Sequence, residues 1–384
     1  MRKLIKRLLG GEDRKPTAEP ASQGRSPQEL PLTPKLANSP IAVERFSREV
    51  PHPGEWTASE RPLISFVLIV YKMPNQAEKT LRSLAVDYQQ GVSAEDYEVI
   101  VVENASSSTL GEERACQYSS NVRYFYREES LPTPVPAVNF GAAQARGTHI
   151  CIMVDGARML SPAVVSYIAA AARLHPTPVV AIPGYHLGHK LQQRAMLEGY
   201  CEKEEEKLLA SIGWPSDGYR LFEIACLSGT SGSGFFKPIG ESNCLCVTRQ
   251  IWDLLGGFDP AFTETGGGQV NLDFYKRAVE LPDTLLVILI GEGSFHQFHG
   301  GITTGTKGEA RVKSMDDHFN QYASLRGGPY RSPTKRPVYL GSVADSSIKF
   351  LHHGTTQALK VQQSLEPAPK PLPVAKDKNI ESPV

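Results

Sequence analysis

An aspartate that directly follows an uninterrupted apolar run is the residue of this sequence best placed for chemistry. Residues 150–154 are all apolar, and Asp155, Gly156, Ala157 and Arg158 come next. Such a run is typical of a strand buried on both faces of a parallel sheet, and ligands bind beyond the carboxyl ends of such strands. An ionised carboxylate there needs a partner, for example a metal ion. Asp-Gly is also a common turn pair, so both interpretations stay open at this stage.

Strands and helices are predicted to alternate on both sides of this aspartate. We expect apolar strands at residues 63–70, 97–102, 122–126, 150–154 and 179–182, and helices at 76–85, 138–146 and 162–175. This alternation predicts an α/β fold with a doubly wound, mostly parallel sheet flanked by helices. Further along, the pattern predicts a charged helix at 192–212, a buried strand at 285–290 and a helix at 312–325.

Several classes of function are disfavoured by what the sequence lacks. The first predicted strand is followed neither by G-x-G-x-x-G nor by G-x-x-x-x-G-K-S/T, which argues against a Rossmann dehydrogenase and a P-loop NTPase. The arginine-containing glycine-rich loop of sugar nucleotidyltransferases is also missing. Lys+Arg and Asp+Glu balance at 41 each, so no basic field points to a nucleic-acid partner.

The two ends of the chain have the composition of disordered segments. Residues 12–62 are rich in Pro, Ser, Glu and Arg, and the chain beyond residue 366 alternates Pro with small and charged residues. We therefore predict a basic N-terminus and disordered linker at 1–61, one large domain at 62–353 and a disordered tail at 354–384. The six cysteines form no CxxC pair, which suits a reducing compartment, and we expect a cytoplasmic protein.

The first ten residues alternate basic pairs with aliphatic pairs at helical spacing. This spacing places Leu4, Ile5, Leu8 and Leu9 on one face of a helix. A short basic amphipathic helix can lie on an anionic membrane surface, which would put the protein at the inner face of the membrane. A solvated N-terminus without membrane contact is the alternative.

An ordered series of segments resembles a known family. The first set is residues 62–71, Tyr97 to Ser106, Asn139-x-Gly141 to Gly147, and Val154-Asp155 to Pro162; the second is residues 241–249, 256–262 and 265–277. Together they resemble the nucleotide-sugar half and the acceptor half of family 2 glycosyltransferases of GT-A fold, here 62–183 and 184–301, with 302–353 as a C-terminal lid or helix. The resemblance implies transfer of a sugar from a nucleotide-diphosphate sugar to a glycan or lipid-linked acceptor, with inversion.

The resemblance also implies a donor site. Glu103 holds the position of the acid that binds the base or ribose, and a carboxylate can accept hydrogen bonds from both. Tyr71 is placed to border the base, and Asn104 and Asn139 belong to the matched segments, so we include them in the predicted donor site. Arg326, in the glycine-containing basic loop 326–331, could close over the diphosphate as a lid.

The family's Asp-x-Asp motif, which binds a divalent ion, is incomplete in this chain. Asp155 matches the first aspartate, but Ala157 replaces the second. The resemblance places histidines of the loop after the late strand near the metal, which selects His299 and His296 as further ligands. We therefore expect Mn²⁺ or Mg²⁺ as cofactor. Arg158 is the alternative, because a guanidinium also neutralises phosphate charge.

The expected general base is missing from its place in the motif. Alignment with the family puts Val270 and Asn271 where the acid would stand, and neither accepts a proton at neutral pH. Asp273 and Glu264 are the nearest candidates, although Asp273 could instead be a first-turn acid that stabilises its helix. The alternative function is therefore a donor-binding or scaffold protein that has kept the fold and lost the chemistry.

Overall fold

The computed structural model describes residues 63–129, 131–236, 239–240, 243–299 and 308–365. The predictions for residues 1–61, including the amphipathic first ten, and for the tail beyond residue 365 lie outside these residues. None of the helices in this part of the chain has the length and apolarity that a membrane crossing requires.

A large sheet of eight strands forms the centre of the fold, in the order β12-β10-β6-β9-β4-β1-β2-β3. All neighbouring strands run parallel except β9, which is antiparallel to both β4 and β6. The predicted α/β class with a mostly parallel sheet is thus confirmed. The strands are β1 (Ile64–Val70), β2 (Tyr97–Asn104), β3 (Val122–Arg127), β4 (His149–Met153), β6 (Pro178–Ala181), β9 (Cys244–Thr248), β10 (Leu285–Leu289) and β12 (Val338–Leu340).

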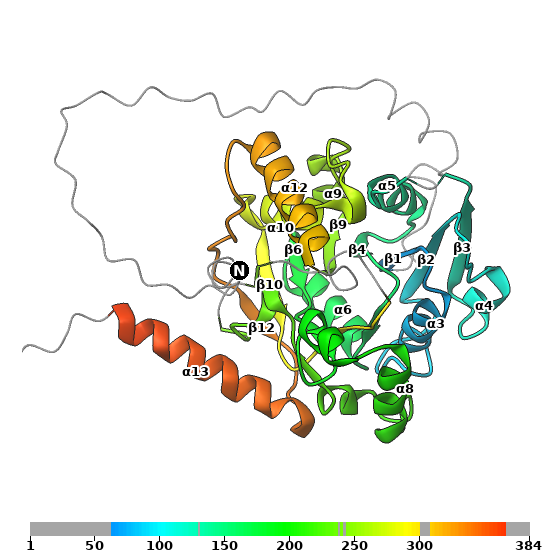
Figure 1. The fold of residues 1–384 in the computed structure, drawn as a ribbon, viewed down its shortest axis with the longest axis horizontal. Coiled ribbons are helices and arrows are strands. Elements are labelled where there is room, and N and C mark those ends of the chain that lie inside the picture. Colours follow the sequence, from blue (N-terminus) through cyan, green and yellow to red (C-terminus); the bar gives the residue numbers. More distant parts are fainter. Residues whose placement is uncertain (1–62, 130, 237–238, 241–242, 300–307, 366–384) are drawn as a thin grey trace, which may run out of the picture.

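Helices cover both faces of this sheet, as Figure 1 shows. Phe66, Leu68 and Val70 of β1 face the cluster that contains residues of α3 (Pro74–Ser83) and α6 (Val164–Leu174). Val67 and Ile69 face the opposite cluster, which is completed by α5 (Val135–Gln144), α9 (Arg249–Leu255), α10 (Val270–Glu280) and α12 (Gly308–Arg326). Because both faces are buried, β1 reads as a continuous apolar run rather than an alternating one.

A second, four-stranded sheet was not predicted from the sequence. Its order is β5 (Arg158–Leu160), β11 (Ser294–His296), β7 (Gly184–Leu187) and β8 (Ala225–Leu227). β11 pairs antiparallel with β5 and parallel with β7, so that His296 lies between Arg158 and His186 in register. This sheet therefore brings together residues from the two predicted halves of the chain.

Two predicted segments differ from the structure. The single helix expected at 192–212 is divided into α7 (Gln192–Ala195), a 3-10 turn and α8 (Glu202–Ser211), because Gly199 adopts a left-handed conformation with φ 95°. Residues 354–365, predicted as part of a disordered tail, continue α13 (Ile348–Leu365). Phe350 at the start of α13 is buried in a third apolar cluster and anchors this helix to the second sheet.

The remaining short elements connect these layers. They are α4 (Glu112–Cys116) and the 3-10 turns η1 (Met196–Glu198), η2 (Gly218–Phe222), η3 (Gly229–Ser231), η4 (Thr265–Gly267) and η5 (Asp345–Ser347).

Candidate metal and donor site

A pocket of about 490 Å³ opens at the carboxyl ends of the central parallel strands. Its volume falls within the range of ordinary small-ligand sites. The loops after β1, β2 and β4 meet here because these strands are parallel neighbours. The described residues that line it are Ile69, Tyr71, Lys72, Met73, Asn104, Leu131, Pro132, Thr133, Pro134, Val154, Asp155, Asn243, Thr265, Gly266, Gly268, Asn271 and His299.

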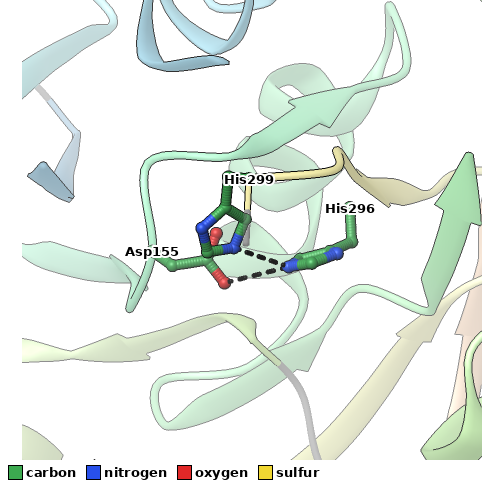
Figure 2. Close-up of side chains that lie close together, drawn as sticks. All are labelled: Asp155, His296 and His299. Carbon is green, nitrogen blue, oxygen red and sulfur yellow. Dashed lines mark hydrogen bonds and ion pairs between the residues drawn. The ribbon is translucent and has the colours of Figure 1, made fainter. Parts of the chain in front are cut away.

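Asp155 and His299, which line this pocket, lie close to the buried His296 behind them (Figure 2). One ligand atom of each residue lies within 4.8 Å of the others. The Nε2 atom of His296 is 3.7 Å from Oδ2 of Asp155 and 3.1 Å from Nε2 of His299. The structure thus brings together the three residues for which the sequence predicted metal binding, although both histidines follow Asp155 by more than 140 residues in the chain.

The protonation states of this cluster suit a cation. Burial alone would raise the pKa of Asp155, but the charge of the Arg158 guanidinium and the hydrogen bond from the Ala157 N–H hold this pKa well below its usual range. Burial lowers the pKa of His296 well below 6.5 and also lowers that of His299. The cluster therefore combines one ionised carboxylate with two neutral imidazoles.

This donor set fits a divalent metal ion. An ionised carboxylate and neutral imidazole nitrogens are the protonation states that metal coordination requires. A carboxylate oxygen and two imidazole lone pairs that face one another repel unless a proton or a cation lies between them. The three residues therefore match a binding site for Mn²⁺ or a similar ion by their chemistry as well as by their proximity.

Arg158 supports the carboxylate rather than lining the pocket. Its side chain is buried, and Nε donates to Oδ2 of Asp155 at 3.2 Å, while the backbone N–H of Ala157 donates to Oδ1 at 3.0 Å. Arg158 is absent from the residues that line the pocket in the described part of the chain. The predicted direct role of Arg158 in binding the diphosphate does not fit this geometry, because its charge is already paired.

Glu103 also has a structural role in place of the predicted one. Its buried carboxylate accepts hydrogen bonds from the backbone N–H groups of Leu110 and Gly111, at 2.6 and 3.0 Å, and from the Tyr124 hydroxyl at 2.6 Å. These bonds hold the loop after β2 against β3. Three donors already engage this carboxylate, and Glu103 is not among the described residues that line the pocket, so its placement does not support the predicted contact with a base or ribose.

The side chain of Asn139 also bonds to the protein backbone. It donates to the carbonyl of Phe258 at 2.8 Å and accepts from the N–H of the same residue at 3.0 Å. The residue thus fixes the loop after α9 and lies outside the lining of the pocket. The prediction that Asn139 contacts the donor is not supported by this placement.

Two other predicted donor residues do line the pocket. Tyr71 follows β1 with 37% of its surface exposed, and Asn104 ends β2. Lys72, which sequence reasoning missed, lines the same wall and has a left-handed backbone with φ 58°. A lysine pays for this conformation in strain, which often marks a functional site. The signal in the sequence was its place two residues after the end of a buried strand.

The two candidate bases lie outside the pocket lining. Asp273 has 1% of its side chain exposed and pairs with Arg277 and Arg326. Arg326 also pairs with Asp259, so the predicted lid residue is held by two carboxylates. Glu264 is half-buried at the start of η4, next to pocket residue Thr265. Neither Asp273 as a base nor Arg326 as a phosphate ligand fits this arrangement.

An amide pair lies where the sequence predicted the base. Asn271 donates from Nδ2 to Oδ1 of Asn243 at 2.6 Å, and both side chains belong to residues that line the pocket. Among the described lining residues, Asp155 is the only acid and Lys72 the only lysine or arginine. Asn243 and Asn271 therefore offer the pocket hydrogen bonds, and apart from Asp155 its described lining contains no carboxylate.

Comparison with known proteins confirms the predicted family resemblance. Residues 65–221 match the family model described as glycosyl transferase family 2. The chain is 24% identical over 318 residues to validoxylamine A glucosyltransferase of Streptomyces hygroscopicus subsp. limoneus, a match that covers 79% of this chain and 66% of the relative. The same enzyme of subsp. jinggangensis is 24% identical over 306 residues, with 76% and 68% covered. The chain thus spans about two thirds of the length of these curated relatives.

Solved structures with a similar fold include S. aureus TarS. The two chains are 15% identical with a TM-score of 0.41, and the match covers 68% of this chain and 72% of TarS.

Proposed function

We propose that this chain, a glycosyltransferase with a family 2 domain at residues 65–221, transfers a sugar from a nucleotide-diphosphate sugar to a hydroxyl group with inversion and metal assistance. The observation that carries the proposal is the cluster of Asp155, His296 and His299, two of which, Asp155 and His299, line a pocket beyond the carboxyl ends of β1, β2 and β4. In this reaction the acceptor oxygen forms a bond to the anomeric carbon, and the diphosphate leaves from the opposite face with the bonding electrons. The acceptor's proton passes to a base or to solvent.

The donor would lie along the loops after β1 and β2. Tyr71 offers a ring face and Asn104 an amide to the nucleoside, since both line the pocket. The Lys72 ammonium lies on the same wall and would attract the negative diphosphate. Lys72 therefore takes the part that the sequence assigned to Arg158 and Arg326.

Asp155, His296 and His299 would hold the metal ion. When bound, this ion neutralises charge that develops on the departing diphosphate. Two imidazole nitrogens favour Mn²⁺ over the harder Mg²⁺, which prefers oxygen ligands throughout. Arg158 keeps Asp155 ionised and oriented through the Nε hydrogen bond and thus supports the site from behind.

The acceptor would enter on the side of Asn243, Asn271 and the glycines around η4. These groups can orient an acceptor hydroxyl through hydrogen bonds, and the class of acceptor that we propose is a glycan or a lipid-linked acceptor. The names of the two curated relatives favour glucose as the sugar transferred. A cytoplasmic location, with contact of residues 1–10 to the inner face of a membrane, completes the proposal.

A donor-binding protein without transfer activity is the second candidate. The observation that favours it is the amide pair of Asn243 and Asn271 on the wall where a general base would be expected. Both candidates require donor binding, and they differ only in turnover.

The first experiment is a calorimetric titration of UDP and GDP into the protein, with and without Mn²⁺. The same titrations are repeated on Asp155→Asn and on Asp253→Asn, an exposed acid on α9 that serves as the matched control. We expect Mn²⁺-dependent binding of one nucleotide, lost only in Asp155→Asn. Absence of nucleotide binding with and without Mn²⁺ would reject both candidates.

Turnover then separates the two candidates. Release of free nucleotide from the matching nucleotide sugar is measured in the presence of candidate acceptors. Acceptor-dependent release identifies the transferase, whereas tight binding without release across the acceptor panel identifies the binding protein.

A further inference from the structure

We propose that Gln192 is a positioning residue of the metal site, which holds His296 in the tautomer that carries its proton on Nδ1. The inference rests on the proposed metal site and concerns a residue from the segment that connects β7 and β8 of the second sheet. Gln192 begins α7 and is fully buried.

The orientation of the Gln192 amide follows from its two hydrogen bonds to one residue. Nε2 of Gln192 donates to the backbone carbonyl of His296 at 2.8 Å. This bond turns Oε1 toward the imidazole, where it lies 2.6 Å from Nδ1 of His296. An amide oxygen carries no proton and can only accept, so the proton in this bond must belong to Nδ1.

The position of this proton decides what the other ring nitrogen presents. A neutral imidazole has a single N–H, so a protonated Nδ1 leaves a lone pair on Nε2. Nε2 is the atom that lies 3.7 Å from Asp155 and 3.1 Å from Nε2 of His299. In the other tautomer, Nε2–H would bond to the carboxylate and exclude a cation, and the Nδ1 lone pair would oppose the Gln192 oxygen.

Gln192 is itself held in place by the second sheet. Its backbone N–H donates to Nδ1 of His186 at 3.0 Å. His186 on β7 is the register neighbour of His296 on β11, with ring centroids 5.4 Å apart. The amide is therefore fixed at its backbone and at its side chain, and its buried position leaves no water to replace its bonds.

The test compares Gln192→Leu with Gln89→Leu. Gln89 is a matched control, because its side-chain amide is also buried and hydrogen-bonded at both ends, to Ser83, Ser161 and Val165, but contacts neither histidine. The tautomer of His296 is read from long-range ¹H–¹⁵N spectra of metal-free protein labelled in histidine. Mn²⁺ affinity is measured by calorimetry on the same samples.

We expect the Nδ1–H tautomer of His296 in the wild type and in Gln89→Leu, and its loss in Gln192→Leu. The affinity for Mn²⁺ should fall roughly 10–100-fold in Gln192→Leu alone, as is usual when the outer partner of a metal-binding histidine is removed. Gln192→Glu, which keeps an acceptor for Nδ1–H, should retain the tautomer and guards against a leucine variant that fails to fold.

Three results would overturn the inference. These are a proton on Nε2 in the wild type, an unchanged tautomer in Gln192→Leu, or an equal loss of Mn²⁺ affinity in Gln89→Leu. A wild-type protein with the Nδ1–H tautomer that binds no Mn²⁺ would instead reject the metal site of the proposed function and support the orientation by Gln192.

Discussion

The guanidinium of Arg326 donates hydrogen bonds to both carboxylate oxygens of Asp273, from Nε at 2.6 Å and from Nη2 at 2.9 Å. Arg277, one turn further along α10, donates to the same carboxylate at 2.8 Å. The residues predicted to take the acceptor's proton and to close over the diphosphate therefore neutralise each other. Their bonds attach the end of α12 to the start of α10.

Asp273→Asn should impair folding stability rather than the chemical step. The substitution leaves two arginines without their buried partner, a change that costs about 3–5 kcal/mol in fully buried pairs. Since the arginines are 26% and 27% exposed, water compensates in part. We expect a loss of about 2–3 kcal/mol in urea unfolding. Activity per folded molecule should change little.

Glu264→Gln is measured beside Asp273→Asn as a second variant of a candidate base. Glu264 was the other candidate base and makes none of these ion pairs. If Asp273→Asn kept its stability and lost its activity, the catalytic role predicted from the sequence would be restored.

Removal of the metal ion should have the same effect as loss of its carboxylate ligand. We expect EDTA to lower kcat/KM of the wild type roughly 100-fold or more, since a metal contributes several kcal/mol to transition-state stabilisation. Asp155→Asn should show a similar loss, and EDTA should lower its activity little further. Added Mn²⁺ should restore the wild type more fully than added Mg²⁺. A wild type indifferent to EDTA would contradict the metal-assisted mechanism.

Asn271→Asp tests whether a missing base limits the reaction. The change places a carboxylate on the pocket wall, beside Asn243, whose amide can rotate to donate to it. A positioned general base contributes about 10²–10⁴-fold, so we expect kcat to rise at least about tenfold. Nucleotide affinity should stay the same. The measurement is kcat as a function of pH. In this variant only, kcat should increase with pH in the acidic range, as the new carboxyl group loses its proton.

Glu292 should make the stability of the fold depend on pH. It is fully buried between the two sheets, where burial raises its pKa from 4.5 to about 7, against hydrogen bonds from Ser161, Tyr219 and the N–H of Ala163. Between these two pH values the folded state binds the proton and the unfolded chain does not. The group's stabilising contribution is thus complete below pH 4.5 and is lost as the pH rises to about 7.

The melting temperature of Glu292→Gln should accordingly depend less on pH than that of the wild type. Between pH ~4.5 and ~7.5, the free energy of unfolding of the wild type should fall relative to that of Glu292→Gln by an amount on the order of 3 kcal/mol. Glu198→Gln, which removes an exposed carboxylate, is the control. Parallel curves for the wild type and Glu292→Gln would show that the carboxyl group titrates outside this window.

The central strands could be predicted because burial on both faces leaves a local signature. β1, β2 and β4 are mostly apolar, and their order in the sequence implied the parallel sheet. The second sheet left no such signature. Its strands are three or four residues long, and three of them carry Arg158, His186 or His296, so they are too short and too polar to be recognised as buried strands.

The structure brings the three predicted metal ligands together and places Tyr71 and Asn104 at the pocket, whereas the other predicted site residues lie outside its described lining. Asp155 stood out because an acid after a buried strand needs a partner, and the family resemblance added the histidines. Glu103 matched the family's motif, and Arg326 was selected for the charge and glycines of its loop, yet the structure bonds Glu103 to Tyr124 of β3 and Arg326 to Asp273 of α10. Such contacts are decided by tertiary packing, which also brings Gln192 to His296.

The antiparallel strand β9 determines how this protein can fold. β4 and β6 are not paired with each other, because β9 lies between them in the sheet. In the chain, β9 comes after both and is separated from β6 by β7 and β8 of the second sheet. During synthesis, before β9 has been made, β4 and β6 therefore have unpaired edges. Such edges are prone to pair with other chains. Such non-local closure is slow. We expect the nucleotide-sugar half not to fold as an isolated fragment, and to fold when residues 184–299 follow it in the same chain.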